Sequence, residues 1–520
     1  MTFDRILQAL ALTPERKGTH LLSLSLEKDN FSRVISQLVH EYGLGLSLLF
    51  ATDDRKKTHA FGLHAVLSHP HELKWLHIST VIPEENPSYE SLTKTVMAAH
   101  WYERYIHDMF GILPEGHPYL QPLVLHENFP EAIHPLRKDF LWDTIPEKME
   151  TVPTMARVEG DGLCEISVGP IHAGIIEPGH FRFHVLGERV IALEGKLFYT
   201  HKGVEKILEG KTIEQAMPFI ERVSGDMAAS HSLAFCQAVE AIANTPVPYA
   251  AKVLRTIVCE LERITMHIHD LSNIAGMGTG FSVMAANGFR IKERMMRLSQ
   301  EIFGNRFWRE FIVPGGVTRV LYTPEKERIL EVLEKAVTEM MSLVNMALQS
   351  HSLCERLEGT GVLTKSAAIA YGAVGLPARA SGVDRDIRRD MPYAGYEDME
   401  YRVVVQKDGD VNARFLSRIA EIEESHKIIL ESFQKLEGHK KEVLVPVNPS
   451  NGEAFGAVES WRGEIFDFVR VTNGVIDRVV IRDPSFCNWA LFGELTPGNI
   501  IPDFPLCNKS LNLSYSGTDV

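Results

Sequence analysis

Cysteine and histidine residues, the side chains that most often bind transition metals, are spaced in ways that disfavour a metal site. The six cysteines form no CxxC pair, the spacing typical of zinc and redox motifs. His267, His269 and Asp270 are close in sequence, but residues i and i+2 of a helix point in different directions. We therefore expect no metal site there and none built from the cysteines, which are Cys164, Cys236, Cys259, Cys354, Cys487 and Cys507.

A run of alternating charges is the first candidate for acid–base chemistry. Arg379, Asp384, Asp386 and Arg388 alternate in sign within the stretch ARASGVDRDIRRD. Carboxylates and guanidinium groups buried together have shifted pKa values and can relay protons. The same residue types also form purely structural ion-pair networks, and that is the favoured interpretation of this run.

Length and composition describe a multidomain globular protein with an acidic surface. The chain has 520 residues, 45% hydrophobic and 23% charged, which predicts two or three folded domains. Its formal net charge of −14 argues against a nucleic-acid partner, because phosphate contacts need a basic surface. No run of 18 apolar residues occurs, and the N-terminus lacks the pattern of a signal peptide. We expect a reduced, cytoplasmic protein that reaches a membrane only through a partner.

The patterning predicts an α+β fold in two parts. Residues 1–145 alternate between strand-like runs and a helix that Gly111 ends. Apolar residues at helical spacing predict long helices at 324–358 and 412–436, and an Asn-Gly turn at 473–474 predicts a β-hairpin. Short alternating runs at 160–200 predict a second hairpin or small sheet.

Motifs along nearly the whole chain resemble two respiratory subunits joined in one order. The first part resembles the 30-kDa-type subunit of respiratory complex I, at residues 101–104, 108–112, 116–118 and 134–140. The second part resembles the 49-kDa-type subunit and the large subunit of membrane-bound nickel–iron hydrogenases. Its matching stretches are GPIHAGIIEPGHFRF at 169–183, HKGVEK at 201–206, SHSLAFCQAVE at 230–240, PGGV at 314–317, ARASGVDRDIRRDMPY at 378–393 and SWRGE at 460–464.

The resemblance implies a domain of the 30-kDa type at 1–145, built on a mixed sheet. At 146–520 it implies a hydrogenase-like long-helix bundle with a small β-subdomain from 160–200 and 446–485. The fused order is similar to formate hydrogenlyase large subunits and to the fused C/D-type subunits of complex I.

The four cysteines that hold nickel and iron in the hydrogenases are absent. Alignment places Ser224 and Met227 at the first pair, and Ser514 and Gly517 at the second pair. Because such a site requires thiolate ligands, the resemblance implies no nickel–iron centre and no hydrogenase activity. If the alignment is correct, segment 486–520 must place Ser514 and Gly517 beside Ser224 and Met227. The tyrosine that contacts quinone in complex I is also replaced, by Gly225.

Polar residues around the lost centre are candidates for a quinone or proton cavity. The resemblance places His172, Glu177 and His180 in the loop that contacts quinone in complex I, and Glu177 at a glutamate that passes protons in hydrogenases. The two histidines could equally satisfy buried backbone groups, whereas a buried carboxylate is rare without a function. The full candidate set is His172, Glu177, His180, Arg222, Ser224, Asp226, Met227, His231, Arg379 and Asp386.

Two functions of different kinds agree with the resemblance. The first is a peripheral-arm subunit of a membrane-bound, complex-I-like oxidoreductase that shapes a quinone or electron-acceptor cavity and couples electron transfer to ion translocation. The alternative is a non-redox scaffold subunit of a cation-translocating, antiporter-like membrane complex.

Both functions predict integral membrane partners, antiporter-like subunits among them, and a peripheral position on the cytoplasmic face of the cell membrane. The first adds an iron–sulfur small subunit, which would carry the cluster. Apart from a quinone, we expect this chain to bind no cofactor of its own. The sequence ends at Val520, directly after the second lost pair, so we expect no cleaved C-terminal extension.

Overall fold

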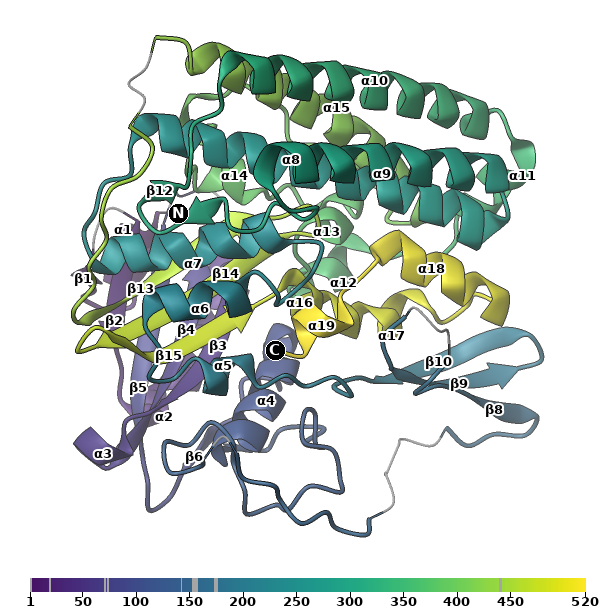
Figure 1. The fold of residues 1–520 in the computed structure, drawn as a ribbon. Coiled ribbons are helices and arrows are strands. Elements are labelled where there is room, and N and C mark those ends of the chain that lie inside the picture. The colour runs from purple at the N-terminus through teal and green to yellow at the C-terminus, as the bar shows by residue number, and fades with distance from the viewer. Residues whose placement is uncertain are drawn as a thin grey trace.

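A computed structural model describes residues 2–17, 20–69, 72, 74–141, 143–151, 158–172, 176–438 and 442–520. The N-terminal part is a five-stranded mixed sheet in which β2 and β5 pair in parallel and the other neighbours are antiparallel (Figure 1). Its strand order is β1 (Glu15–Arg16), β2 (Leu21–Ser25), β5 (Trp75–Pro83), β4 (Ala60–Ser68) and β3 (Gly45–Asp53). The mixed sheet predicted for this part is confirmed.

Helices cover one side of this sheet. α2 (Lys28–Tyr42) contacts β5, and α4 (His100–Phe110) contacts β3. Gly111 ends α4 in the left-handed conformation, as its position in the sequence predicts. A single helical turn, α3 (Arg55–Thr58), connects β3 to β4, and α1 (Phe3–Ala9) precedes the sheet.

Four long helices form the bundle at the top of Figure 1. They are α8 (Tyr249–Asn273), α9 (Ser282–Phe303), α10 (Thr323–Leu348) and α15 (Val411–Lys435). α8 and α10 each contact both α9 and α15, so the four helices enclose one core. The helix predicted at 412–436 is confirmed within one residue at each end. The helix predicted at 324–358 is two helices, because Ser350 is extended and separates α10 from α11 (His351–Leu357).

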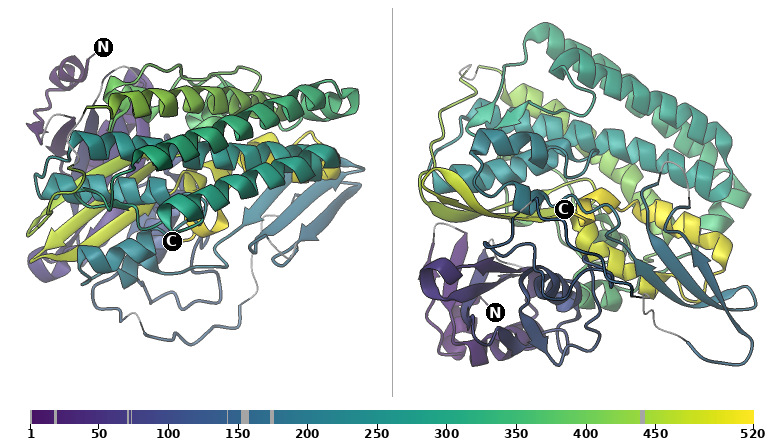
Figure 2. Two further views of the ribbon diagram at one scale, coloured as in Figure 1. Left: turned by 45° about the horizontal axis from the view of Figure 1, so that its top comes forward. Right: turned by 60° about the horizontal axis from the view of Figure 1, so that its bottom comes forward.

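The two β-rich segments of the second part form separate sheets, which corrects the single β-subdomain expected from the sequence. β13 (Gly452–Glu459), β14 (Glu464–Thr472) and β15 (Val475–Arg482) form one sheet, and α7 (Ala228–Ile242) packs against β13 and β14. β8 (Leu163–Val168), β9 (His180–Leu186) and β10 (Arg189–Lys196) form another, which extends from the edge of the molecule (Figure 2). Asn473 and Gly474 have positive φ and make the predicted turn between β14 and β15.

Short elements connect these layers, and several of them return to the bundle near the C-terminus. Among the described helices, none is both long and apolar enough to span a membrane. The short elements are β6 (Ser88–Glu90), β7 (Leu113–Glu115), α5 (Val204–Ile207), α6 (Ile213–Ile220), η2 (Ile274–Gly278), β11 (Ile312–Val313), β12 (Gly316–Val317), α12 (Lys365–Ala370), α13 (Leu376–Ala380), α14 (Ile387–Asp390), α16 (Pro484–Asn488), α17 (Phe492–Leu495), α18 (Phe504–Leu511) and α19 (Tyr515–Thr518).

Candidate functional site

Two segments that lie 290 residues apart in sequence meet between α7 and α19. The hydroxyl oxygens of Ser224 and Ser514 are hydrogen-bonded at 3.0 Å. Ser514 caps α19 by accepting a hydrogen bond from the backbone N–H of Gly517, at 2.8 Å. Met227 precedes α7 and is fully buried. The meeting of Ser224 and Ser514 is what the alignment of the two lost ligand pairs requires.

An arginine–aspartate pair lies beside these serines. Arg462 donates two hydrogen bonds to the carboxylate of Asp226, at 2.8 and 2.6 Å, and the Ser224 hydroxyl donates a third at 2.8 Å. Burial opposes ionisation of Asp226, but the Arg462 charge and these hydrogen bonds outweigh it and lower its pKa to about 2. Sequence reasoning missed Arg462, although it lies in the SWRGE stretch that carries the resemblance.

A fully buried histidine–aspartate pair lies behind the serines. Nε2 of His231, on α7, is 3.1 Å from Oδ2 of Asp483, which caps α16. Burial raises the pKa of Asp483, but His231 and the more distant Arg462 charge act more strongly and lower it below its usual range. A Cβ atom on Gly517 would lie 2.3 Å from Asp483, so no larger side chain fits at that position.

The predicted loop residues His172, Glu177 and His180 differ in burial. His172 and Glu177 are exposed and His180 is half-buried, while Ala173, Gly174 and Ile175 between them lie outside the described residues. Glu177 accepts a hydrogen bond from the backbone N–H of Ser516, beside the centre, at 2.9 Å. His172 and Glu177 are therefore not buried in this structure, and the quinone or proton cavity expected around them stays a prediction.

Arg222 also points away from the centre. Its side chain is half-exposed and donates a hydrogen bond to the carbonyl oxygen of Pro218, at 2.7 Å. The neighbouring Glu221 is buried instead and accepts a hydrogen bond from the backbone N–H of Glu310. Of the candidates Arg222, Asp226 and His231, which border the first lost pair in sequence, Asp226 is hydrogen-bonded to Ser224 and His231 to Asp483, whereas Arg222 is hydrogen-bonded to Pro218.

The alternating charges at 379–388 form a separate, buried ion-pair network. Arg379 lies 2.8 Å from Glu421 and 2.6 Å from Glu459, and Arg388 lies 2.6 Å from Asp386. The side chains of these five residues are at most 4% exposed. These contacts agree with the favoured interpretation, a structural network, which stays a prediction. Asp384 lies outside this network and pairs with Arg389 at the surface.

Two ionisable residues near the centre, the half-buried Lys202 and the fully buried Glu262, escaped sequence reasoning. Lys202 donates hydrogen bonds to the carbonyl oxygen of Val223, at 3.0 Å, and to the hydroxyl of Ser516, at 2.7 Å. Glu262, on α8, accepts hydrogen bonds from the first turn of α7, at Ala229 and Ser230. Burial outweighs these donors and raises the pKa of Glu262 to about 8. Lys202 lies in the HKGVEK stretch, whereas nothing in the sequence pattern marks Glu262.

A nickel–iron centre does not fit the residues at the lost ligand positions. They offer two hydroxyl groups, one thioether and a glycine, and no thiolate, the ligand such a centre requires. Among the residues that the structure describes, no group of three or more His, Cys, Asp or Glu residues could hold a metal ion. The arrangement can instead hold and exchange protons through carboxylates, an imidazole and hydroxyl groups.

Fold and site together describe a hydrogenase-type large-subunit domain without metal ligands, joined to a mixed-sheet domain. Family models agree along the chain: the respiratory-chain NADH dehydrogenase 30 Kd subunit matches residues 24–145, and the 49 Kd subunit matches 278–446 and 430–520. The nickel-dependent hydrogenase model matches residues 202–275.

Similar proteins join the same two parts. Formate hydrogenlyase subunit 5 of Escherichia coli (strain K12) is 30% identical over 96% of this chain and 89% of its own length. A fused C/D-type NADH-quinone oxidoreductase subunit of Aquifex aeolicus (strain VF5) is 28% identical over 95% of this chain and 89% of its own length. The chain belongs to this family of fused complex I 30-kDa/49-kDa-type and hydrogenase large subunits.

A solved structure has the same fold over much of the chain. A chain from the membrane-bound sulfane sulfur reductase, described as an archaeal respiratory membrane complex, aligns with a TM-score of 0.65 and 25% sequence identity. The alignment covers 69% of this chain and 99% of that chain.

Proposed function

We propose that this chain is the peripheral subunit of a membrane-bound, complex-I-like oxidoreductase in which electron transfer to a quinone or another acceptor is coupled to ion translocation. The observation that carries the proposal is the polar centre formed by Ser224, Ser514, Asp226 and Arg462. The alignment of the lost ligand pairs supports the proposal, because Ser224 and Ser514 belong to those pairs, and the relatives are named as formate hydrogenlyase and NADH-quinone oxidoreductase subunits. The iron–sulfur cluster would be carried by a small partner subunit.

The protonation chemistry of the centre supports a coupling role. Asp226 is ionised and paired, whereas Glu262 has a pKa of about 8 and exchanges its proton near neutral pH. A change of charge at a neighbouring cluster or acceptor would shift the Glu262 equilibrium, because like charges disfavour ionisation. The partner subunits would transmit such a change in protonation to the membrane arm, where it would affect ion movement.

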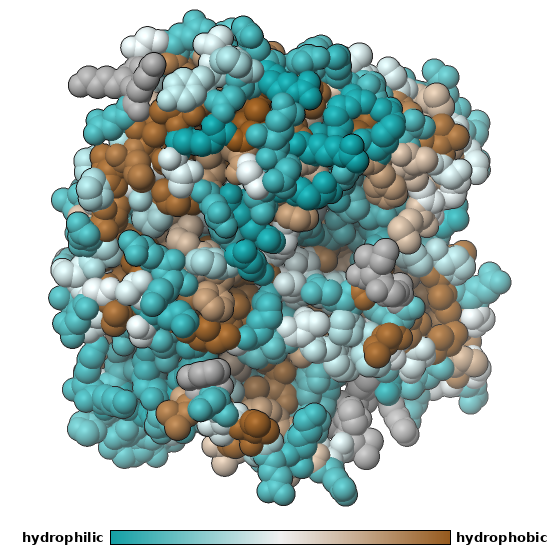
Figure 3. Space-filling model, in the orientation of Figure 1, coloured by the Kyte–Doolittle hydropathy of each residue, from teal (hydrophilic) through white to brown (hydrophobic). Residues whose placement is uncertain are grey.

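Exposed apolar side chains on the β8–β10 sheet and on the segment after β8 support a protein partner at this end of the molecule. Ile166, Leu186 and Ile191 lie on the strands and Ile171 follows β8; they are 39%, 52%, 40% and 89% exposed, and we call them the hairpin patch. The strand register places Ile166 and Leu186 on opposite faces of the sheet, so the partner would contact its edge. Figure 3 shows hydrophobic residues over β9 and β10, while the outer helices of the bundle are hydrophilic. A patch of this kind on a sheet that extends from the molecule is typical of a protein interface. We propose that it contacts the iron–sulfur small subunit.

Purification from native membranes tests this proposal. A tagged chain, extracted in mild detergent, is expected to co-purify with an iron–sulfur small subunit and antiporter-like membrane subunits, identified by mass spectrometry. The double variant Ile171→Asp/Leu186→Asp should lose the small subunit. Ile369→Asp, at a 60% exposed position on α12, is the matched control and should retain it. A chain recovered from the soluble fraction without membrane partners would sink the proposal.

The same preparation separates the proposal from its alternative. Antiporter-like subunits recovered without any iron–sulfur protein would favour the non-redox scaffold, which the lack of thiolates at the lost ligand positions also supports. We propose further that no nickel is bound. Elemental analysis of the purified complex should then find iron from the partner's cluster and nickel far below one atom per chain.

A further inference from the structure

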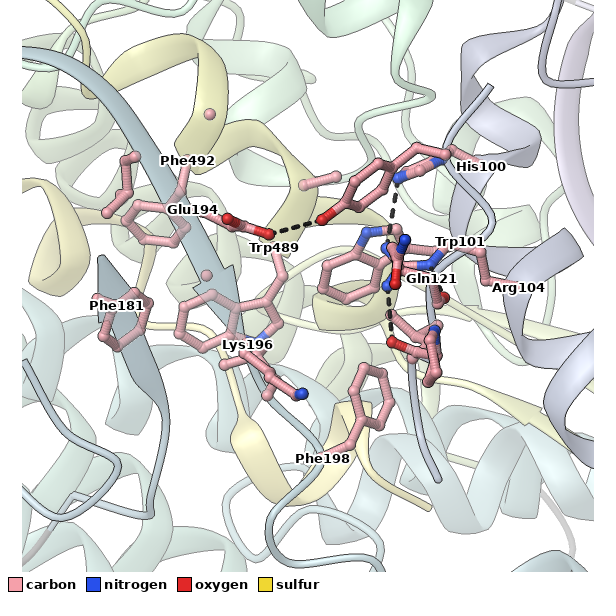
Figure 4. A pocket seen from close by; sticks show the side chains of 18 of the residues that line it. His100, Trp101, Arg104, Gln121, Phe181, Glu194, Lys196, Phe198, Trp489 and Phe492 are labelled. Atoms are coloured by element: carbon pink, nitrogen blue, oxygen red, sulfur yellow. Dashed lines mark hydrogen bonds between the residues drawn. The ribbon is translucent and has the colours of Figure 1, made fainter. Parts of the chain in front are cut away.

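A cavity lies between the two parts of the chain, on the side of the β8–β10 sheet that faces α4 (Figure 4). Its volume is about 240 Å³. None of the candidate residues discussed above lines it. Its walls come from α4, residues 119–127, strand β10 with the segment after it, and residues 489–493. Its aromatic lining is Trp101, Tyr119, Phe181, Phe198, Tyr371, Trp489 and Phe492.

The charged groups of this cavity are compensated by the protein itself. Lys196 is ion-paired with Glu127, and the Tyr119 hydroxyl donates a hydrogen bond to Glu194, at 2.8 Å. Arg104, which is 9% exposed, donates to the carbonyl oxygens of Gln121 and Pro122, at 2.8 and 2.9 Å. Two cations and two carboxylates therefore face the same space, and neither sign is in excess.

Charge balance and size restrict what the cavity can hold. A cationic ligand would meet Arg104 and Lys196, and an anionic ligand would meet Glu127 and Glu194. Like charges brought together in a partly buried site are unfavourable, so an uncharged ligand fits best. An apolar cavity of about 150 Å³ holds benzene, and sites for drug-sized molecules measure about 300–1,000 Å³. A volume of about 240 Å³ lies between the two.

We propose that this cavity binds an uncharged, planar molecule of one or two fused rings whose edge carries hydrogen-bond-accepting oxygens. Aromatic walls favour stacking on a flat ring. Arg104 has five N–H donors, of which the hydrogen bonds to Gln121 and Pro122 and a 3.5 Å contact with Nε2 of His100 engage three, and Lys196 is a further donor. These two side chains would donate hydrogen bonds to acceptor oxygens on the ring.

The cavity is connected to the polar centre by one side chain. The indole ring of Trp489 lines the cavity, and its N–H donates a hydrogen bond to the carbonyl oxygen of Ser514, at 3.4 Å. The same ring packs against Tyr515, with 4.8 Å between ring centroids. A ligand stacked on Trp489 would therefore contact the residue that positions the Ser514 segment. The inference stands whether or not the chain takes part in redox turnover.

Calorimetric titration of the full chain with coumarin tests the proposal, because coumarin is an uncharged two-ring molecule with acceptor oxygens. We expect binding with a Kd below about 1 mM, a modest affinity in keeping with its small size. Benzyltrimethylammonium and 2-naphthoate, the cationic and anionic counterparts, should bind at least about tenfold more weakly. Absence of coumarin binding, or equal binding of either charged probe, would overturn the proposal.

Two variants locate the binding in this cavity. Gly493 lines it, has an ordinary φ, and a Cβ atom there would meet nothing within 4 Å. Gly493→Leu should therefore fold normally and weaken coumarin binding about tenfold, while Ser366→Leu, at an exposed position on α12, should not. Lys196→Met leaves Glu127 uncompensated and should raise the affinity for benzyltrimethylammonium. Unchanged coumarin binding by Gly493→Leu would contradict the assignment.

Discussion

Asp226 and Arg462 show how a charged side chain inside the polar centre is compensated by a single neighbouring residue. The carboxylate receives two hydrogen bonds from the guanidinium group and one from Ser224. Paired hydrogen bonds of this kind are about twice as strong as neutral ones and fix geometry as well as charge. The serine pair between α7 and α19 is therefore held in place by an ion pair that the chain supplies.

Removing the Asp226 charge tests this conclusion. A fully buried pair costs about 3–5 kcal/mol when one partner is removed, and the 29% exposure of the Asp226 side chain lowers our expectation to about 2–3 kcal/mol for Asp226→Asn. Asp384→Asn breaks the exposed pair with Arg389 and should cost less than about 1 kcal/mol. Chemical denaturation measures both, and equal losses would contradict a special role for the centre.

Glu262 should make stability depend on pH near neutrality. Its pKa is raised to about 8 in the folded chain from an ordinary value of 4.5, mainly by burial. Its stabilising contribution is therefore complete below about pH 4.5 and is lost as the pH rises through 8. Glu262→Gln should remove part of this loss of unfolding free energy, which amounts to about 1.4 kcal/mol for each unit of pKa shift.

The measurement compares wild type and Glu262→Gln by denaturant unfolding at pH 5.5 and pH 9. The variant should gain stability relative to wild type as the pH rises. Parallel pH profiles would show that Glu262 has an ordinary pKa. Glu327→Gln, at an exposed position on α10, is a control for the substitution itself.

At the scale of elements, two histidines lie where the N-terminal sheet meets the β13–β15 sheet. Nδ1 of His64, on β4, is 3.0 Å from Nε2 of His77, on β5, and Phe50 stacks on His64 at 4.7 Å. Burial lowers the pKa of both histidines, that of His77 to about 4. Lys17 and Arg470 also disfavour the charged form of His77, while Glu453 opposes them.

This interface should weaken in acid. Because the folded pKa of His77 lies below the ordinary value of 6.5, the stability is complete above about pH 6.5 and is lost as the pH falls through 4. His77→Gln keeps a hydrogen-bonding side chain that does not titrate and should flatten the fall between pH 6.5 and 4. Unfolding midpoints in urea at several pH values measure the pH dependence of stability in wild type and variant. The same fall in midpoint with pH in both proteins would contradict the prediction.

Elements with a strong local pattern could be predicted, and those fixed by distant contacts could not. The apolar repeat at 412–436 and the Asn-Gly turn depend only on neighbours in sequence, and both are found. The break at Ser350 and the separation of the two small sheets depend on what each segment packs against. For the site, the alignment predicted the contact between Ser224 and Ser514. The burial of Glu221 in place of Arg222 is decided by tertiary packing, so it could not be predicted.

For the whole molecule, contacts between the two parts predict one cooperative unfolding transition. Phe50 of the first part packs against Phe468 of the second, at 4.7 Å between centroids. Arg385 donates hydrogen bonds to Ser47 and Ser68 across the same boundary, at 3.2 and 2.6 Å. Parts joined by a buried apolar and polar interface unfold together when the interface is large.

Calorimetry and spectroscopy check this expectation. One heat-capacity peak should coincide with the loss of far-ultraviolet circular dichroism and with the change in tryptophan fluorescence. Phe468→Ala, at a fully buried position, should cost about 3–5 kcal/mol and lower the whole transition. Two peaks in the wild-type chain would mean that the parts are energetically independent.

The contact between Ser224 and Ser514 also has a consequence for folding during synthesis, because it cannot form until both segments have been made. At about 5–20 residues per second of synthesis, the 290 residues between them take roughly 15–60 s to emerge. During that interval α7 and Asp226 have left the ribosome without the segment that covers them. The incomplete centre would be accessible to chaperones that bind nascent chains during this interval. Slow translation through residues 227–513 would lengthen its exposure.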